Sequence, residues 1–254
     1  MPEPTTPAIT ASRTSAQAVI LALAPPAPGL SSAAPTPGLE LLGGSRLVER
    51  LRRTLGGVLS SPPVVVTTPS ARGPMRTLLG PEVRVLEATD RSEALSAALD
   101  ATDHASLLLH DAERALTPSS VIVEVLGIGL QETDLVVPVV AMTDSIKGVS
   151  PAGLRNIDRS GVVGLQSPRL IRREILEQVL AAERTAPPRE NTPAVGARAF
   201  DEVLGALSLG ARVRTVHGSH AGFAVVDRLS LWQAQISLGL ARDTSHRHGL
   251  ARGA

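Results

Sequence analysis

The sequence predicts a three-layer α/β fold, with a mostly parallel, twisted sheet and helices on both faces. Short apolar runs, typical of strands buried on both sides, alternate along the chain with segments that have the spacing of amphipathic helices. The length of 254 residues, 43% of them hydrophobic, suits one domain with a sizeable core. In such folds binding sites lie beyond the carboxyl ends of the strands.

The two ends of the chain differ in composition from the rest. Residues 1–15 are rich in Thr, Pro, Ser and Ala without apolar periodicity, and residues 243–254 are rich in His and Arg. We expect two disordered tails around a single domain at 16–242. No run has the length of a membrane span or the layout of a secretory signal. We therefore expect a cytoplasmic protein without a membrane partner.

The first half of the domain contains four short apolar runs bounded by turn residues, which predict strands at 18–24, 64–67, 83–86 and 106–110. Helical spacing of apolar residues follows two of them, at 45–55 and 91–101. A loop rich in Pro and Gly, 25–38, separates the first strand from the first helix.

The second half continues the alternation. Two further apolar runs predict strands at 135–140 and 212–217. Apolar spacing predicts four helices, at 119–130, 170–183, 200–209 and 229–241.

Composition excludes several classes of function. The chain has no Cys, which excludes a disulfide scaffold, a thiol nucleophile and a cysteine-bound metal. A net charge of +1 gives no general attraction to nucleic acid, and the three aromatic residues leave little for base stacking. Lys147 is the only lysine among 25 basic residues. Codon bias in a GC-rich genome explains most of that deficit.

Six segments occur in the order of motifs of a known family. They are Ala18-Val-Ile-Leu-Ala, Gly43-Gly-Ser-Arg-Leu-Val-Glu49, Leu109-His-Asp-Ala-Glu-Arg114 (compare VHDAARP), Val137 to Lys147 (VPVxPVTDTIK), Ile157-Asp-Arg159 (LDR) and Leu165-Gln-Ser-Pro168 (VQTPQ). In this order and spacing, the chain resembles 2-C-methyl-D-erythritol 4-phosphate cytidylyltransferase. The resemblance implies a Rossmann-like nucleotidyltransferase fold of the nucleotide-diphospho-sugar transferase type, with a small protruding β-arm.

The resemblance also implies a reaction. The family joins CTP to a sugar-alcohol phosphate of isoprenoid biosynthesis and releases pyrophosphate. Mg²⁺, basic side chains and loop N–H groups must stabilise the charge of the triphosphate. An active chain would therefore need Mg²⁺, CTP and a sugar-alcohol phosphate. Family members are usually dimers joined by the arm at 147–155, so we expect a homodimer or a heterodimer with an active paralogue.

Several site residues can be carried over by position. Asp111 matches the aspartate that holds Mg²⁺, although an aspartate capping the following turn fits the sequence equally well. Arg91 matches an arginine of the segment that binds the nucleotide. Three residues match positions that bind the substrate, with a serine in place of threonine at one of them: Arg114, Ser145 and Arg159. The late TD motif falls near Asp201.

Other positions depart from the family. Its first loop reads LAAGxGxRxxxxPK, but here the first glycine is Ala24 and the lysine is Gly38. The sequence has no Arg or Lys between Arg13 and Arg46. The lysine of the late NIKVT strand is Ala224. No catalytic lysine is therefore retained at either of the two family positions.

Magnitudes favour a loss of catalysis. Removing one preorganised donor at a charged transition state costs roughly 3–4 kcal/mol, or 10²–10³ in rate. Several donors are missing at once, so we expect a catalytically degenerate homologue. The first alternative is an active cytidylyltransferase or other nucleotidyltransferase with an altered loop or substrate, in which Arg46 or Arg72 could compensate. The second is an unrelated α/β protein.

Overall fold

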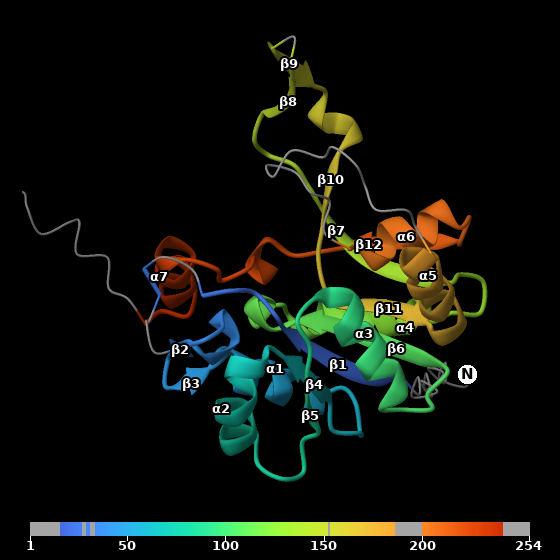
Figure 1. The fold of residues 1–254 in the computed structure, drawn as a ribbon. Coiled ribbons are helices and arrows are strands. Elements are labelled where there is room, and N and C mark those ends of the chain that lie inside the picture. The colour runs from blue at the N-terminus through green and yellow to red at the C-terminus, as the bar shows by residue number, and fades with distance from the viewer. Residues whose placement is uncertain (1–15, 27–28, 31–33, 152, 186–199, 241–254) are drawn as a thin grey trace, which may run out of the picture.

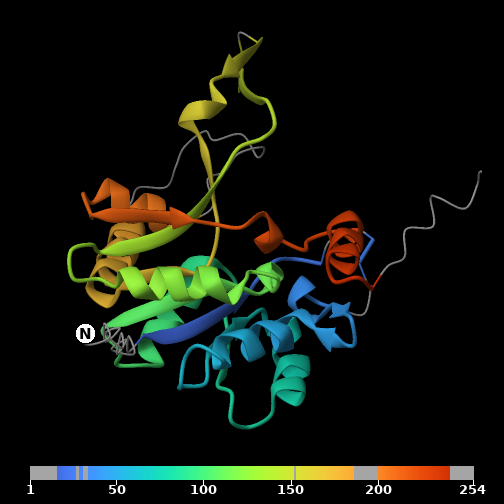
Figure 2. The same ribbon diagram turned by 180° about the vertical axis from the view of Figure 1, so that it is seen from behind.

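The computed structural model describes residues 16–26, 29–30, 34–151, 153–185 and 200–240. These residues form a twisted central sheet with helices on both faces (Figures 1 and 2), so the expected fold class is confirmed. The expected tails lie in segments outside the described residues. The domain limits of 16 and 242 stay a prediction.

The described strands of the central sheet follow the order β10-β7-β11-β6-β1-β4-β5, with β12 also paired to β7. Four neighbouring strands form a parallel block: β1 (Gln17–Ala22), β4 (Val64–Thr67), β5 (Val85–Glu87) and β6 (Ser106–Asp111), and β7 and β12 run in the same direction beyond β11. The others are β7 (Leu135–Ala141), β10 (Val163–Leu165), β11 (Arg169–Arg172) and β12 (Val213–His217). β12 is parallel to β7, whereas β11 runs antiparallel between β6 and β7, and β10 is antiparallel to β7.

Each face of the sheet carries its own apolar core. The first core contains residues of α1 (Leu47–Gly56), α2 (Pro69–Leu79), α4 (Ser119–Ile128) and α7 (Arg228–Ser237). The second contains residues of α3 (Arg91–Asp100), α5 (Arg173–Thr185) and α6 (Glu202–Ser208). In β1, Ile20 belongs to the first core, while Val19 and Leu21 belong to the second. Burial on both faces explains the unbroken apolar runs.

Two parts of the chain differ from the prediction. The segment 170–183 does not begin as a helix, because Arg169–Arg172 form β11 and α5 begins at Arg173. Leu170 and Ile171 belong to opposite cores, which is the alternation of a strand. The helix α2 was not predicted, because its sequence contains two prolines and a glycine. Pro69 is tolerated there at the first position of the helix, while Pro74 lies inside it.

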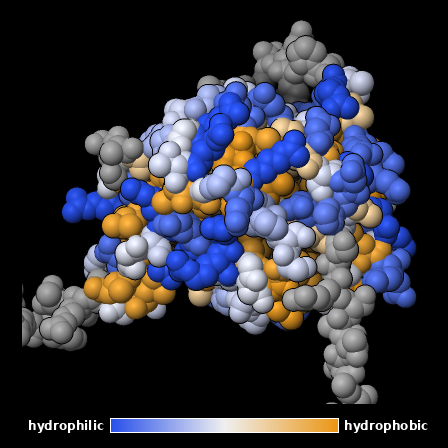
Figure 3. Space-filling model, turned by 90° about the horizontal axis from the view of Figure 1, so that it is seen from below, coloured by the Kyte–Doolittle hydropathy of each residue, from blue (hydrophilic) through white to orange (hydrophobic). Residues whose placement is uncertain are grey.

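The expected arm is a hairpin of β8 (Ile146–Ser150) and β9 (Gly153–Ile157) that projects from the body in Figure 1. A second small hairpin, β2 (Leu41–Leu42) with β3 (Ser45–Arg46), precedes α1. Seen from the side opposite the arm, apolar and hydrophilic residues are interspersed (Figure 3). Among the described residues, no helix has the length and apolar character needed to span a bilayer.

Candidate functional site

The candidate site lies where the parallel strands β1, β4 and β6 end. Strand pairing places Leu21 beside Asp111 and Ala22 beside Thr67, so the loops that follow these strands meet at one edge of the sheet. A turn of 3-10 helix, η2 (Ala112–Arg114), begins directly after Asp111. This is the edge at which the strand order predicts a site.

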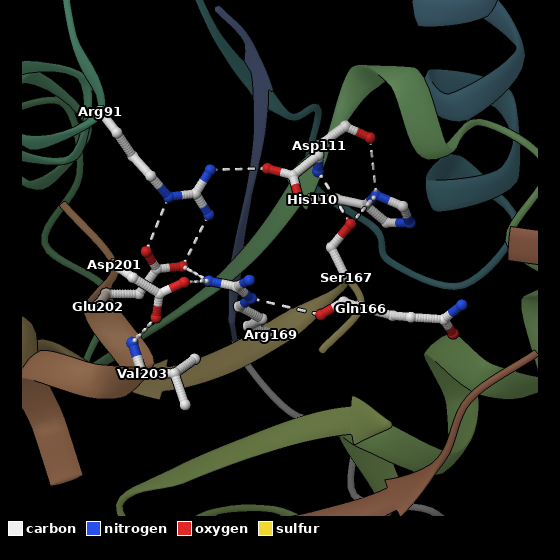
Figure 4. A network of polar contacts seen from close by, with 9 residues as sticks. All are labelled: Arg91, His110, Asp111, Gln166, Ser167, Arg169, Asp201, Glu202 and Val203. Carbon is white, nitrogen blue, oxygen red and sulfur yellow. Dashed lines mark hydrogen bonds and ion pairs between the residues drawn. The ribbon is translucent and has the colours of Figure 1, made fainter. Parts of the chain in front are cut away.

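Asp111 belongs to a group of charged side chains shown in Figure 4, here called the Arg91–Glu202 cluster: Arg91, Asp111, Arg169, Asp201 and Glu202. Nη1 of Arg91 donates to Oδ1 of Asp111 at 2.8 Å. Nε and Nη2 of Arg91 donate to the two carboxylate oxygens of Glu202 at 2.8 and 2.7 Å. The expected nucleotide arginine and the expected metal aspartate are thus close together, and they bind each other.

Arg169 completes the cluster from β11. Its Nη1 donates to Oε1 of Glu202 at 2.7 Å and to Oδ2 of Asp201 at 3.3 Å. Oδ1 of Asp201 accepts hydrogen bonds from the backbone N–H groups of Val203 and Leu204, so Asp201 is the N-cap of α6. Asp111, by contrast, makes no side-chain cap hydrogen bond to the described residues of η2.

Burial and the neighbouring arginines shift the carboxylate pKa values of this cluster in opposite directions. Burial alone would raise the pKa of Glu202, but hydrogen bonds and charge from Arg91, together with the charge of Arg169, lower it to about 2. Asp111 behaves in the same way, because burial raises its pKa and the charges of Arg91 and Arg169 bring it below its usual value. The carboxylates of Glu202 and Asp111 therefore remain ionised at neutral pH.

A second set of hydrogen bonds holds the backbone of Asp111. Its N–H donates to Oγ of Ser167 at 3.1 Å, and the same Oγ lies 3.1 Å from Nδ1 of His110. His110 is fully buried, and its Nε2 has no hydrogen-bond partner among the described residues. Burial lowers the pKa of His110 to about 4, so the imidazole is neutral at pH 7.

The two positions expected to hold lysines in the family lie on two sides of η2. Gly38, in the 3-10 turn η1 (Pro37–Leu39), is buried, and a Cβ built on it would lie 3.1 Å from Cβ of Ala112. Ala224 lies between Gly222, whose carbonyl accepts from Arg114 at 2.8 Å, and Val225, whose N–H donates to the carbonyl of Glu113 at 2.8 Å. The chain therefore brings both positions to one turn, beside Asp111.

The segment 222–226 is not the strand that the resemblance implied. It leaves the 3-10 turn η4 (His220–Gly222) and passes irregularly to α7. Its backbone is bonded to η2 at Arg114 and Glu113 rather than to a neighbouring strand. Ala24, the expected first glycine position, lies two residues beyond β1 and is half-buried.

Glu113 introduces a further carboxylate beside Asp111. Its Oε2 is buried without a hydrogen-bond partner among the described residues. Burial, together with the charge of Asp111, raises the pKa of Glu113 to about 7. Burial also lowers the pKa of Arg114, although the charges of Asp111 and Glu113 counteract it.

The expected substrate residues of the arm lie apart from this cluster. Arg159 belongs to the exposed 3-10 turn η3 (Arg159–Gly161) and donates to the carbonyl of Thr143. Ser145 is exposed between β7 and β8. Lys147, on β8, is also exposed and donates to Oδ1 of Asn156 across the hairpin. The structure thus unites Arg91, Asp111 and Arg114 at the sheet edge, and groups Ser145 with Arg159 at the arm.

Known proteins resemble this chain in sequence and fold. The family model of 2-C-methyl-D-erythritol 4-phosphate cytidylyltransferase matches residues 39–240. Proteins of that name from Frankia casuarinae and Rhodococcus jostii are each 31% identical, covering 79% and 75% of this chain and 73% and 81% of their own lengths.

This chain belongs to the 2-C-methyl-D-erythritol 4-phosphate cytidylyltransferase family. Solved structures have the same fold. The crystal structure of the Thermus thermophilus cytidylyltransferase aligns with a TM-score of 0.67 at 20% identity, over 87% of this chain and 98% of that one. The match to the family model begins at Leu39, immediately after Gly38, so it leaves out the loop 25–38.

The residues present do not fit the Mg²⁺ that the cytidylyltransferase family implies. Oδ1 of Asp111, the carboxylate that would hold it, accepts a hydrogen bond from Arg91. In the part of the chain that the structure describes, no three His, Asp or Glu side chains are grouped so that they could hold a metal ion. Magnesium usually takes one or two carboxylates and completes its octahedral shell with water and substrate phosphates, but the carboxylate offered here is bonded to a guanidinium.

Sequence reasoning missed the importance of three residues. Arg169 lies where the cytidylyltransferase motif VQTPQ ends in glutamine, and Glu113 lies where VHDAARP has alanine. Both changes were visible in the sequence as new charges within a motif. Glu202 follows the expected Asp201 directly, but only the tertiary fold brings it to Arg91.

Proposed function

We propose that this chain keeps the fold of the cytidylyltransferase family but does not perform its cytidylyl transfer. The observation that carries the proposal is the environment of η2. Both family lysine positions border this turn, and they are Gly38 and Ala224. Without these cations, charge stabilisation is missing at the triphosphate and at the substrate, each worth roughly 3–4 kcal/mol at the transition state and not strictly additive.

Packing supports the same conclusion at Gly38. The space where a Cβ would lie is bordered by Cβ of Ala112 at 3.1 Å, and by Cβ of Ala22 and Cε of Met75 at 3.4 Å each. A side chain could enter only if these buried neighbours moved. The position has therefore changed from one that holds a cation into part of the core.

The remaining arginines near Asp111 are bonded to protein groups. Arg91 and Arg169 bind carboxylates of the Arg91–Glu202 cluster, and Arg114 donates to the carbonyl of Gly222. A triphosphate with about four negative charges would have to compete for these donors. It would also approach the Glu113 carboxylate, which adds negative charge when ionised.

The two arginines that could have compensated are occupied elsewhere. Nη1 of Arg46 donates to the carbonyl of Leu39. Arg72 forms an exposed ion pair with Glu87 at 3.1 Å. Neither arrangement supports a role in binding the triphosphate at Asp111.

An assay of the full chain tests the proposal. Incubation with CTP, Mg²⁺ and methylerythritol phosphate is followed by pyrophosphate release and by ³¹P NMR of the diphosphocytidyl product. The Rhodococcus jostii relative serves as the positive control. We expect no product above background and no micromolar binding of CTP with Mg²⁺ by titration calorimetry. Turnover, or binding of that strength, would establish the alternative of an active enzyme, and the other nucleoside triphosphates would then define its substrate.

We also propose that the arm mediates dimerisation, with a second copy or an active paralogue. Val149 and Leu154 are paired across the hairpin and are 83% and 71% exposed, which leaves an apolar pair on a projecting element. Light scattering after size exclusion should give twice the chain mass of 26.4 kDa, and Val149→Asp should reduce it. A monomeric mass for the wild-type chain would contradict the homodimer. Co-purification with a tagged active paralogue then tests the heterodimer.

A further inference from the structure

The Arg91–Glu202 cluster joins four elements that are distant in the sequence. Arg91 begins α3, Asp111 ends β6, Arg169 begins β11 and Glu202 begins α6. Figure 4 shows their side chains converging from these separate ribbons. The cluster therefore lies where the helices of the second core meet the carboxyl end of the sheet.

Glu202 is the centre of the cluster. Its side chain is 0% exposed, and both carboxylate oxygens accept from Arg91 in the parallel two-bond arrangement typical of strong Arg–carboxylate pairs. Oε1 also accepts from Arg169, whose side chain is 9% exposed. A carboxylate without access to water depends on these two guanidinium groups for compensation of its charge.

Asp111 lies at the more exposed edge of the same cluster, with a side chain 13% exposed. Three carboxylates and two guanidinium groups leave the cluster with one net negative charge. At Asp111 itself, the ion pair with Arg91 supplies positive charge where a divalent cation would otherwise lie, while the cluster as a whole stays negative. Arg169 adds its positive charge to the cluster through Glu202 and Asp201, in a position where the family motif has an uncharged glutamine.

We infer that Asp111 holds the guanidinium of Arg91 in place of a metal ion, so that this carboxylate now serves a structural ion-pair cluster, completed by Arg169 and Glu202, that fastens α3 and α6 to the sheet. The inference rests on the proposed function, because a working transferase would have to release Asp111 for the metal. The cluster needs no divalent cation for its stability. Breaking the cluster strongly destabilises the fold, because removing one partner leaves a buried charge uncompensated.

Thermal unfolding of the full chain tests the structural role. Glu202→Gln leaves both arginines without their shared carboxylate, and we expect the melting temperature to fall by roughly 10 °C. The matched control is Glu87→Gln, the same change in an ion pair whose side chains are 42% and 49% exposed, and we expect a shift within about 2 °C. Equal shifts in the two variants would overturn the inference.

A milder variant keeps the test usable if Glu202→Gln does not fold. Asp111→Asn removes one charge at the edge of the cluster and keeps the shape of the side chain. We expect a folded protein with a melting temperature several degrees lower. A variant as stable as the wild type would contradict the structural role of Asp111.

A measurement of metal binding distinguishes a structural ion pair from a metal site. Mn²⁺ is titrated into the wild-type chain, without CTP and with CTP against a protein-free CTP blank, and the free ion is followed by electron paramagnetic resonance. We expect no stoichiometric binding, and the same melting temperature in MgCl₂ as in EDTA. One bound Mn²⁺ per chain that is lost in Asp111→Asn would overturn the inference.

These results are separable from the test of the proposed function. Cytidylyl transfer by the wild type would remove the proposed function and with it the replacement of the metal, whatever the melting temperatures. Absence of transfer, with Glu202→Gln as stable as Glu87→Gln, would remove the structural cluster and leave the proposed function standing.

Discussion

Gly38 packs directly on Ala112, with a virtual Cβ of the glycine only 3.1 Å from Cβ of the alanine. The contact joins the end of the first loop to the turn that follows Asp111. The position that by resemblance corresponds to the loop lysine of the family is here closed by the neighbouring turn.

The first prediction concerns reversal of this change. Gly38→Lys should not restore CTP binding, and it should lower the free energy of unfolding by about 1–3 kcal/mol, because Ala112, Ala22 and Met75 must move. Urea denaturation measures the stability and titration calorimetry the binding. Ala224→Lys is the matched variant, because it restores the other family lysine. Micromolar CTP binding by Gly38→Lys would show that the surroundings adapt to the side chain and that the damage to the site is smaller than we infer.

The second prediction concerns the contact between α5 and α6. A Cβ on Gly205 would lie 2.4 Å from Cγ1 of Val179. Glycine to alanine inside a helix normally stabilises by about 0.5–1 kcal/mol, but here overpacking should reverse the sign and cost about 1–3 kcal/mol. Gly127→Ala in α4 is the control. Apart from its own helix backbone and chain neighbours, no described residue lies within 4 Å of the virtual Cβ of Gly127. Denaturant midpoints that rise for both variants would refute the close packing.

The third prediction concerns the pH dependence contributed by Glu113. Its pKa is raised to about 7 by burial and by Asp111, so the folded state retains a proton that the unfolded chain releases near 4.5. The contribution of Glu113 to the free energy of unfolding is therefore full below pH 4.5 and is lost as the pH rises to 7. Glu113→Gln should be more stable than the wild type by about 2–3 kcal/mol at pH 8 and equal to it near pH 4. A difference that does not change between these pH values would contradict the shifted pKa.

His110 should act with the opposite sign. Its pKa is lowered to about 4 by burial, so the unfolded chain takes up a proton below pH 6.5 while the folded state remains neutral. Stability from this residue is full above pH 6.5 and is lost as the pH falls to 4, by about 2–3 kcal/mol. His110→Asn should remove this slope, although it should lower stability at every pH through the lost contact with Ser167. Parallel stability curves for the two proteins would argue against a neutral, buried imidazole.

The regular elements could be predicted where one pattern dominated. Val64–Thr67 is a strand with the expected limits, because a short apolar run bounded by Pro62-Pro63 and Pro69 has few other solutions. The strand Arg169–Arg172 was hidden, because Leu170 and Ile171 continue the apolar spacing of the helix that follows. Their placement between β6 and β7 is decided by tertiary packing.

The candidate site could be predicted in its members but not in its bonds. The motifs identified Arg91 and Asp111, and the strand order placed them at one edge of the sheet. Their mutual ion pair could not be derived from the motifs, because in the family pattern one contacts the nucleotide and the other a metal. It depends on Glu202, which lies 111 residues beyond Arg91 and completes the guanidinium contacts.

The long separation of Arg91 from Glu202 has a consequence for synthesis of the chain. On the ribosome, the segments that become α3, β6 and β11 emerge before α6 exists. Until α6 emerges, Arg91 can bind only Asp111, and Arg169 has neither of its carboxylate partners. The nascent chain therefore carries Arg169 without its carboxylate partners next to a half-built second core, and the cluster is completed only after α6 has been synthesised.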